Sequence, residues 1–381
     1  MTYKVLCVTD RSDLPETELF IGLHNAGLDI EVACNPTGRY FQRLQDAHVP
    51  THRLIAASRF SISSVRAVRR ILARKNYDIL YCFNNKAASN VLMATRGQKY
   101  KIITYRGTVG NLSFLSPASW TTHLNPRVDR IVCVSKAVRQ HLLDMRFLGR
   151  GIAPQKAVAI YKGHDPAWYQ GPVADLDQEF GIPANAFVVG FAGRNRPHKG
   201  IGYLIDAARD LPGGANIHFL LLGKLSGDRR LHKKMAQSPH PDRIHWGGFR
   251  NDAPAVFAAC DTFVMPSTQR EGLSRAVIEA MARGTPPVVT DVGGLPELVQ
   301  AGHSGLVVPP MDSKALAKAI MRLYEHPDQR RLMGHNAQER IGSHFHIQGT
   351  VEQTRIMFEN LMTPARDRSH MPFPSLPGPD H

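Results

Sequence analysis

Two loops in the C-terminal half of the chain carry the residues best suited to binding a charged ligand. The first loop, Gly193–Gly200, follows an apolar run at 187–192 and contains Arg194 and Lys199. Two cations between a strand and a helix favour a diphosphate, which they bind through charge-assisted hydrogen bonds. A solvated basic loop is the alternative interpretation. The pattern G-x-x-x-x-G-K-[ST] is missing from this loop, and G-x-G-x-x-G follows neither first strand, which argues against a P-loop enzyme and a dinucleotide dehydrogenase.

The second loop leads into a predicted helix at 274–283, which ends at Gly284, a residue typical of helix C-termini. Free N–H groups at a helix start attract anions. In the loop, Glu271 suits hydrogen bonds from sugar hydroxyls, and in the helix Glu279 suits those from a ribose diol. Alternatively, Glu279 forms an ordinary helical salt bridge and Glu271 offsets the helix dipole.

Alternating strand and helix patterns must position these loops. In the first half, strands are predicted at 3–9, 29–34, 78–83, 101–105 and 130–134, with helices at 16–27, 63–75 and 135–146. In the second half, strands are predicted at 187–192, 217–222, 243–246, 261–265, 287–290 and 305–308, with helices at 200–211, 253–259, 274–283, 295–301 and 313–325. This alternation predicts βαβ units and two parallel, doubly wound sheets. Ligands then bind beyond the carboxyl ends of the strands, in a cleft between two domains.

The segment around both loops resembles a known enzyme family. Glu271-x7-Glu279, within EGLSRAVIEAMARGTPPVVTDVGGLPELV, is similar to the E-x7-E signature of family-4 retaining glycosyltransferases, which have the GT-B fold. Further segments resemble that family in order and spacing: GRNRPHKG, Gly247–Arg250 and Gly302–Val307. The resemblance covers residues 187–325 and is loose in the N-terminal half.

The resemblance implies an α/β protein with two Rossmann-like domains whose parallel sheets face each other across a cleft. An acceptor-binding domain is expected at 1–165, and a domain that binds a nucleotide-sugar donor at 170–340. A final helix around 345–361 is expected to return to the first domain. The proline-rich end, 363–381, is expected to be disordered.

The implied reaction moves a sugar from a nucleoside-diphosphate sugar to a surface polysaccharide or glycolipid acceptor, with retention of configuration. Residues implied to bind the donor are Gly193, Arg194, Lys199, Phe249, Arg250, Glu271, Gly272, Leu273, Ser274 and Glu279. In this scheme Arg194 and Lys199 bind the diphosphate and Glu279 the ribose. The loop at 271–274 holds the transferred sugar and a phosphate, and the turn at 249–250 faces the base. No metal or other cofactor is expected, because fixed cations and helix N–H groups stabilise the leaving diphosphate.

One position departs from the family pattern. Where the family usually has a histidine after a strand of the first domain, this chain has Arg106. As a permanent cation, Arg106 either takes over the donor contact or binds an anionic group on the donor or acceptor. It joins Glu271, Arg194 and Lys199 as a candidate catalytic residue. The loop after the first strand, Asp13–Glu16, also lacks the glycines that the family often has there.

The chain is strongly basic, with 47 Lys and Arg against 32 Asp and Glu, a net charge of +15. Such a surplus favours a polyanionic partner. The predicted helix at 63–75 carries five basic residues and an apolar stripe, Val65, Val68, Ile71 and Leu72. The stripe is expected in the core, and docking to an anionic membrane that holds a lipid-linked acceptor is the alternative. A nucleic-acid partner is not expected, since no helix-turn-helix, zinc-finger or RNP-type motif is present.

Other features bound the setting of the protein. The five cysteines lie far apart, without a C-x-x-C pair, and buried thiols in a reducing compartment are expected. The first apolar run is too short for a signal peptide, so a cytoplasmic protein is expected, with peripheral attachment to the inner face of the cell membrane as an option. Asp175-Leu176-Asp177 falls in the presumed linker at 163–183 and is interpreted as surface charge rather than a metal site. An epimerase or hydrolase on the same fold is the alternative to a transferase.

Overall fold

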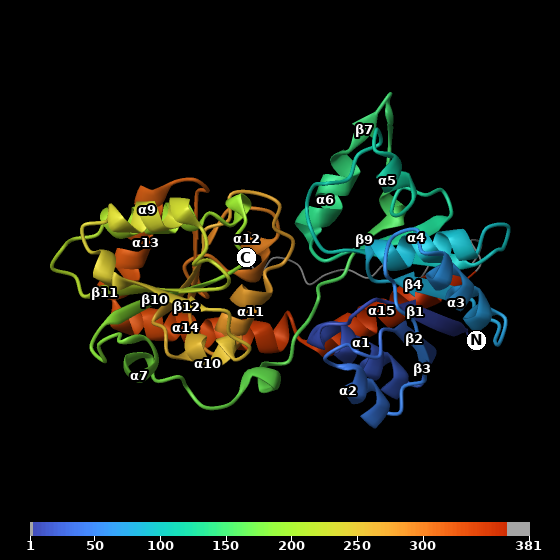
Figure 1. Cartoon of the computed structure of the whole chain (residues 1–381), viewed down its shortest axis with the longest axis horizontal. Helices are drawn as coiled ribbons and strands as arrows, with labels where there is room; N and C mark the ends of the chain where they lie inside the picture. The colour runs from blue at the N-terminus through green and yellow to red at the C-terminus, as the bar shows by residue number, and fades with distance from the viewer. Residues whose placement is uncertain (1–2, 364–381) are drawn as a thin grey trace. The chain divides into compact units, whose positions relative to one another are not determined.

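The computed structural model describes residues 3–363, which divide into two α/β units (Figure 1). The first unit contains the described residues up to Gly163 and those from Ile347 onward, and the second runs from His164 to His346. The sequence placed the first domain's end at 165. However, the N–H of His164 donates to the Phe345 carbonyl (2.7 Å), and the N–H of Gly163 donates to the Thr350 hydroxyl (2.8 Å). The boundary therefore lies between residues 163 and 164. The predicted tail lies outside the described residues, apart from residue 363.

The first unit contains a seven-stranded parallel sheet in the order β3-β2-β1-β4-β5-β6-β9. Its strands are β1 (Lys4–Val8), β2 (Asp29–Cys34), β3 (Thr51–Arg53), β4 (Ile79–Cys82), β5 (Lys101–Arg106), β6 (Val128–Cys133) and β9 (Ala157–Ala159). The strand order reverses between β1 and β4, which makes the sheet doubly wound with its ligand-binding edge at that switch point. The sequence patterns predicted five of these strands and missed β3 and β9.

Helices connect these strands and cover the sheet of the first unit. They are α1 (Leu14–Asn25), α2 (Phe41–Asp46), α3 (Ile62–Leu72), α4 (Asn85–Ala94), α5 (Pro117–Trp120), α6 (Lys136–Asp144) and α15 (Ile347–Met362). A two-stranded hairpin, β7 (Arg146–Phe147) and β8 (Arg150–Gly151), and the 3-10 turn Pro154–Lys156 lie between α6 and β9. Asp13, Ser61 and Ser135 cap α1, α3 and α6 by accepting backbone N–H hydrogen bonds, which explains why these helices begin there.

Helix α3 settles which of two interpretations applies to the basic segment at 63–75. Its stripe of Val65, Val68, Ile71 and Leu72 is buried in a cluster that also contains residues of β1, β4 and α4. Its arginines face outward, as expected for an amphipathic helix that covers a sheet. The stripe is therefore not available to a membrane.

Helix α15 completes the first unit from the far end of the chain. It packs on α1, and Phe358 is fully buried, with its ring edge-on to Tyr81 (centroids 6.0 Å apart) and Tyr3 (6.2 Å). It matches the final helix expected around 345–361, and the non-helical residues 344–346 separate it from the helix before it.

The second unit repeats the same architecture with six parallel strands in the order β12-β11-β10-β13-β14-β15. Its strands are β10 (Phe187–Ala192), β11 (Ile217–Leu222), β12 (Ile244–Gly248), β13 (Thr262–Met265), β14 (Pro287–Thr290) and β15 (Leu306–Val308). Nearly all residues of these strands are buried except in the edge strand β12, because helices cover both faces of the sheet. The switch point lies between β10 and β13, and the two candidate donor loops follow these two strands.

The helices of the second unit are α7 (Leu176–Phe180), α8 (Ile201–Arg209), α9 (Arg229–Ala236), α10 (Ala253–Ala258), α11 (Arg275–Ala282), α12 (Leu295–Leu298), α13 (Ser313–Glu325) and α14 (Pro327–Ser343). Short 3-10 turns occur at Pro166–Tyr169, Pro197–Lys199 and Pro241–Arg243. The Asp175-Leu176-Asp177 string belongs to this unit and not to a linker. The Asp175 carboxylate caps α7 by accepting from the N–H groups of Asp177 (3.1 Å) and Gln178 (3.0 Å), so its function is structural.

All five cysteines are buried, as expected, and none forms a disulfide within the described residues. Within residues 3–363, no helix combines the length and apolarity needed to cross a membrane.

Candidate donor-binding site

A buried ion pair joins the two loops at the switch point of the second sheet. The Lys199 ammonium lies 2.6 Å and 3.1 Å from the two carboxylate oxygens of Glu271. The side chains are 17% and 8% exposed, so each charge depends on the other for compensation. The two residues are 72 positions apart in sequence. The structure therefore brings together the strongest candidate from each loop.

Close backbone contacts hold the Lys199 loop in place. Gly200 has a φ of 69°, and a Cβ at this position would lie 1.8 Å from the carbonyl oxygen of Pro266, in the loop that carries Glu271. The carbonyl of His198 accepts the N–H of Thr268 (2.8 Å) in the same loop. Only glycine permits this approach at residue 200, so the loops are fixed to each other independently of the ion pair.

The backbone around Glu271 is strained and supported from a third loop. Arg270 has a φ of 62°, which is uncommon for a long side chain and is typical of functional loops. After β14, Gly293 lies so close that its Cβ would be 2.0 Å from the Glu271 carbonyl oxygen. The N–H of Gly294 points to the same oxygen (3.4 Å). Sequence reasoning did not single out Gly293 and Gly294, although a Gly-Gly pair after a strand is a signal of close backbone approach.

The start of α11 provides backbone donors beside this pair. Ser274 is the N-cap residue, but its side chain forms no capping hydrogen bond, and the first turn of α11 contains no acidic residue. The orphan N–H groups and the positive end of the helix dipole favour an anion here. Gly272 and Ser274 are buried and Leu273 is half-buried, as residues that shape a site would be.

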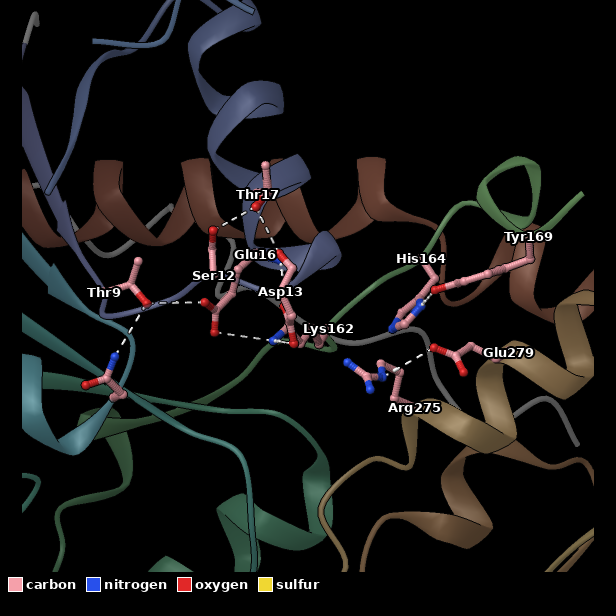
Figure 2. Close-up of polar contacts among 11 residues, drawn as sticks. Thr9, Ser12, Asp13, Glu16, Thr17, Lys162, His164, Tyr169, Arg275 and Glu279 are labelled. Carbon is pink, nitrogen blue, oxygen red and sulfur yellow. Dashed lines mark hydrogen bonds and ion pairs between the residues drawn. The ribbon is translucent and has the colours of Figure 1, made fainter. Parts of the chain in front are cut away.

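Glu279 lies within α11, where the Arg275 guanidinium is 3.3 Å from one of its carboxylate oxygens (Figure 2). The exposed fraction is 63% for Arg275 and 16% for Glu279. An i,i+4 pair with one partner exposed to solvent is weak. The salt bridge of the alternative interpretation of Glu279 thus exists, and the contact of this carboxylate with a ribose diol stays a prediction.

Other predicted donor residues differ in how they are engaged. Arg194 is exposed and forms no ion pair within the described part of the chain, so its charge is available to a ligand. Its neighbour Gly193 packs tightly against the chain just after β11. A Cβ on Gly223 would lie 2.0 Å from the Gly193 carbonyl oxygen. Phe249 is 64% exposed after β12.

Arg250, in contrast, is occupied by the protein itself. Its guanidinium donates to both carboxylate oxygens of Asp252 (2.8 and 2.7 Å), contacts Glu179 (2.6 Å) and lies over the Phe180 ring. Its side chain therefore fixes the turn after β12, and its predicted contact with a base stays a prediction.

Arg106 belongs to the first unit, at the end of β5. It is 7% exposed, donates to the Gly110 carbonyl, and leaves its Nε without a partner among the described residues. Burial lowers the pKa of Arg106. Nearby His123 is 2% exposed and hydrogen-bonds to the Thr104 hydroxyl (3.0 Å). Burial and the Arg106 charge lower the pKa of His123 to about 3, so this imidazole is neutral near pH 7.

A second polar cluster, which sequence reasoning missed, lies at the switch point of the first sheet (Figure 2). Lys162 lies 2.8 Å from a carboxylate oxygen of Asp13 and 3.3 Å from one of Glu16. Thr9, just after β1, donates to Glu16 (3.4 Å). Burial raises the pKa of Glu16 to about 7, although Lys162 acts in the opposite direction. The partners are about 150 residues apart in sequence, so no local pattern could have revealed them.

Two doubly wound units with these loops define the GT-B fold, and comparisons with known proteins agree. The model "Glycosyltransferase Family 4" matches residues 17–168, and the model "Glycosyl transferases group 1" matches residues 173–340. Together they support a GT-B glycosyltransferase.

Individual relatives point the same way. The chain is 25% identical to an Escherichia coli UDP-Gal:alpha-D-GlcNAc-diphosphoundecaprenol alpha-1,3-galactosyltransferase, over 94% of this chain and 95% of that protein. It is 31% identical to the Rhizobium meliloti lipopolysaccharide core biosynthesis glycosyltransferase LpsE, over 57% and 60%. The chain spans 60% and 43% of the length of two further curated relatives. Among solved structures, Anabaena HepE in complex with UDP is 25% identical with a TM-score of 0.74, over 93% of this chain and 99% of that chain.

Proposed function

We propose that the chain transfers a sugar from a nucleoside-diphosphate sugar to a saccharide or glycolipid acceptor of a surface polysaccharide or lipopolysaccharide pathway, with retention of configuration. The observation that carries the proposal is the buried Lys199–Glu271 pair beside the uncapped start of α11. A cation, a carboxylate and free backbone donors at one switch point suit a ligand with both phosphates and hydroxyls.

The donor is proposed to bind in the second unit. Lys199 and the exposed Arg194 contact the diphosphate, the backbone of 272–274 donates to a phosphate, and Glu271 accepts hydrogen bonds from the transferred sugar. Glu279 accepts from the ribose. Since HepE is solved with UDP, uridine diphosphate is the first nucleotide to test.

The chemistry follows from where charge develops. Breaking the bond between the sugar and the phosphate leaves negative charge on the departing diphosphate, and fixed cations and helix N–H groups stabilise that charge as it forms. We expect transfer to continue in the presence of a metal chelator, because Lys199 and Arg194 supply positive charge that a metal would otherwise provide. The acceptor is proposed to bind in the first unit, where Arg106 and the Glu16–Lys162 cluster supply charged and hydrogen-bonding groups.

Calorimetric titration of the full chain with UDP, GDP, ADP and their sugar conjugates, without added metal, tests the donor site. One nucleotide should bind selectively, and Lys199→Ala should abolish binding. Lys318→Ala is the matched control, because it removes one exposed positive charge from α13 of the same unit. Binding that survives Lys199→Ala, or that is lost equally in Lys318→Ala, contradicts the assignment.

A second comparison separates the two interpretations of Glu279. Glu279→Ala and Arg275→Ala both break the ion pair in α11, but only Glu279→Ala removes the proposed ribose contact. Donor binding should weaken in Glu279→Ala and persist in Arg275→Ala. Product analysis with and without acceptor then distinguishes transfer from hydrolysis or epimerisation of the donor.

A further inference from the structure

The tip of the β7–β8 hairpin combines backbone strain with an exposed apolar side chain. Phe147 pairs with Arg150, so Leu148 and Gly149 form a two-residue loop, with φ angles of 49° and 75°. Asparagine and glycine are the residues favoured in such turns, and leucine is disfavoured. Leu148 is nevertheless 86% exposed, so no packing within the chain offsets the strain. The fold alone gives no reason for leucine at this position.

The β7–β8 hairpin protrudes from the first unit (Figure 1), and Leu148 at its tip belongs to a larger apolar surface. We define the hairpin surface as Phe114, Leu115, Trp120, Phe147 and Leu148. The Phe114 ring stacks on Phe147 (6.4 Å between centroids) and contacts Trp120 (6.0 Å). Leu115 is 75% exposed, and Trp120 and Phe147 are 42% and 40% exposed. Large exposed apolar groups gathered in this way mark an interaction site.

The charge around the hairpin surface identifies the kind of partner. Residues 145–156 contain Arg146, Arg150 and Lys156 and no acidic residue. Arg146 donates only to backbone carbonyls, and within residues 3–363 neither Arg146 nor Arg150 forms an ion pair. The nearest carboxylate in sequence, Asp144, is hydrogen-bonded by Gln140 (2.8 Å). The hairpin therefore presents uncompensated positive charge.

An apolar tip with a tryptophan and an arginine rim complements the surface of an anionic bilayer. Tryptophan favours the headgroup level of membranes, where its ring is half-buried and its N–H is bonded. The Trp120 indole N–H already donates to the Phe114 carbonyl (2.7 Å), so burial of this ring leaves no orphan donor. Basic residues near an anionic leaflet add favourable electrostatic energy.

We propose that the hairpin surface docks the first unit onto an anionic lipid bilayer. Leu148 and Phe147 enter the interface, and Arg146 and Arg150 contact the headgroups. The apolar stripe of α3 is buried and therefore cannot enter the bilayer. No residue of the hairpin surface belongs to the proposed donor site, so vesicle binding and donor binding can fail independently.

Co-sedimentation of the full chain with vesicles tests the docking. Wild type should bind vesicles of phosphatidylglycerol and phosphatidylcholine, and binding should fall with salt. Leu148→Asn should weaken binding about tenfold, since one apolar side chain no longer enters the interface. It should not lower thermal stability, because asparagine accepts the turn conformation that strains leucine. Met311→Asn is the matched control, since Met311 in the second unit also has a positive φ (61°) and is 61% exposed.

The fluorescence of Trp120 locates the contact. In the Trp168→Phe, Trp246→Phe background it is the only tryptophan, and its emission should shift to the blue on vesicle binding. Equal binding to phosphatidylcholine alone, unchanged binding by Leu148→Asn, or no shift of Trp120 in the bound state overturns the proposal. Self-association that is lost in Leu148→Asn, without vesicle binding, also overturns it and assigns the surface to a second copy of the chain.

Discussion

Removing the Lys199 charge should destabilise the second unit, because it leaves a buried carboxylate uncompensated. The Glu271 side chain is 8% exposed and the Lys199 side chain 17%. Breaking a buried pair by removing one partner costs about 3–5 kcal/mol, and the partial exposure of Lys199 places Lys199→Met at the lower end, about 3 kcal/mol. For a unit of this size, that loss lowers the unfolding midpoint by about 6–12 °C.

The double variant tests the physical cause. Lys199→Met with Glu271→Gln removes both charges. The stability loss of this double variant should therefore be about 2 kcal/mol smaller than the summed losses of the two single variants. Glu271→Gln alone should bind UDP at least as tightly as wild type, since the amide neither repels the diphosphate nor holds Lys199 as an ion pair.

Tryptophan fluorescence can follow the second unit alone. Trp120 is the only tryptophan in the first unit, and Trp168 and Trp246 lie in the second. In a Trp120→Phe background, thermal unfolding monitored by emission therefore reports the unit that contains the ion pair. Lys318→Met, an exposed substitution in α13, should change stability by less than about 0.5 kcal/mol. If Lys199→Met behaves like this control, or if the single losses simply add, the pair does not stabilise the fold as described.

Three further changes have definite expected outcomes. Gly200→Ala should abolish donor binding, because its Cβ would lie 1.8 Å from the Pro266 carbonyl oxygen and force the two loops apart; nucleotide titration at wild-type affinity would contradict this. Burial would raise the pKa of Glu31, but hydrogen bonds from lysine, tyrosine and histidine side chains lower it to about 2. This carboxylate therefore contributes about 3 kcal/mol of stability above pH 4.5, and this contribution is lost as the pH falls toward 2. In Glu31→Gln the free energy of unfolding should depend less on pH between 4.5 and 2. Asp175→Ala should lower the free energy of unfolding by about 1 kcal/mol through loss of the α7 cap, which urea unfolding can measure. Added divalent metal should not change the transfer rate of this variant.

Buried parallel strands were predictable because they are short apolar runs between turn residues. The ranges predicted at 29–34, 187–192, 217–222 and 287–290 match β2, β10, β11 and β14 to the residue. In the first sheet, the strands missed were β3 and β9, of three residues each. So short a segment gives little period to detect; β15, which is equally short, was predicted within 305–308.

The site was predictable only as separate loops. Local patterns and family resemblance led to Lys199, Glu271 and Glu279, but not to the ion pair between the first two, because long-range contacts leave no local pattern. The ion pair between Arg250 and Glu179 was not foreseeable, because the two residues lie far apart in sequence. The Glu16–Lys162 cluster was missed for the same reason.

The position of α15 has a consequence for synthesis. The second unit is continuous, from His164 to His346, so all of its residues are synthesised before those of α15. The first unit must wait for Phe358 to cover Tyr81 and Tyr3. Because domains fold as units during synthesis, the middle of this chain can finish folding before its beginning does. A stop codon just after residue 346 would leave the second unit whole and expose the core of the first.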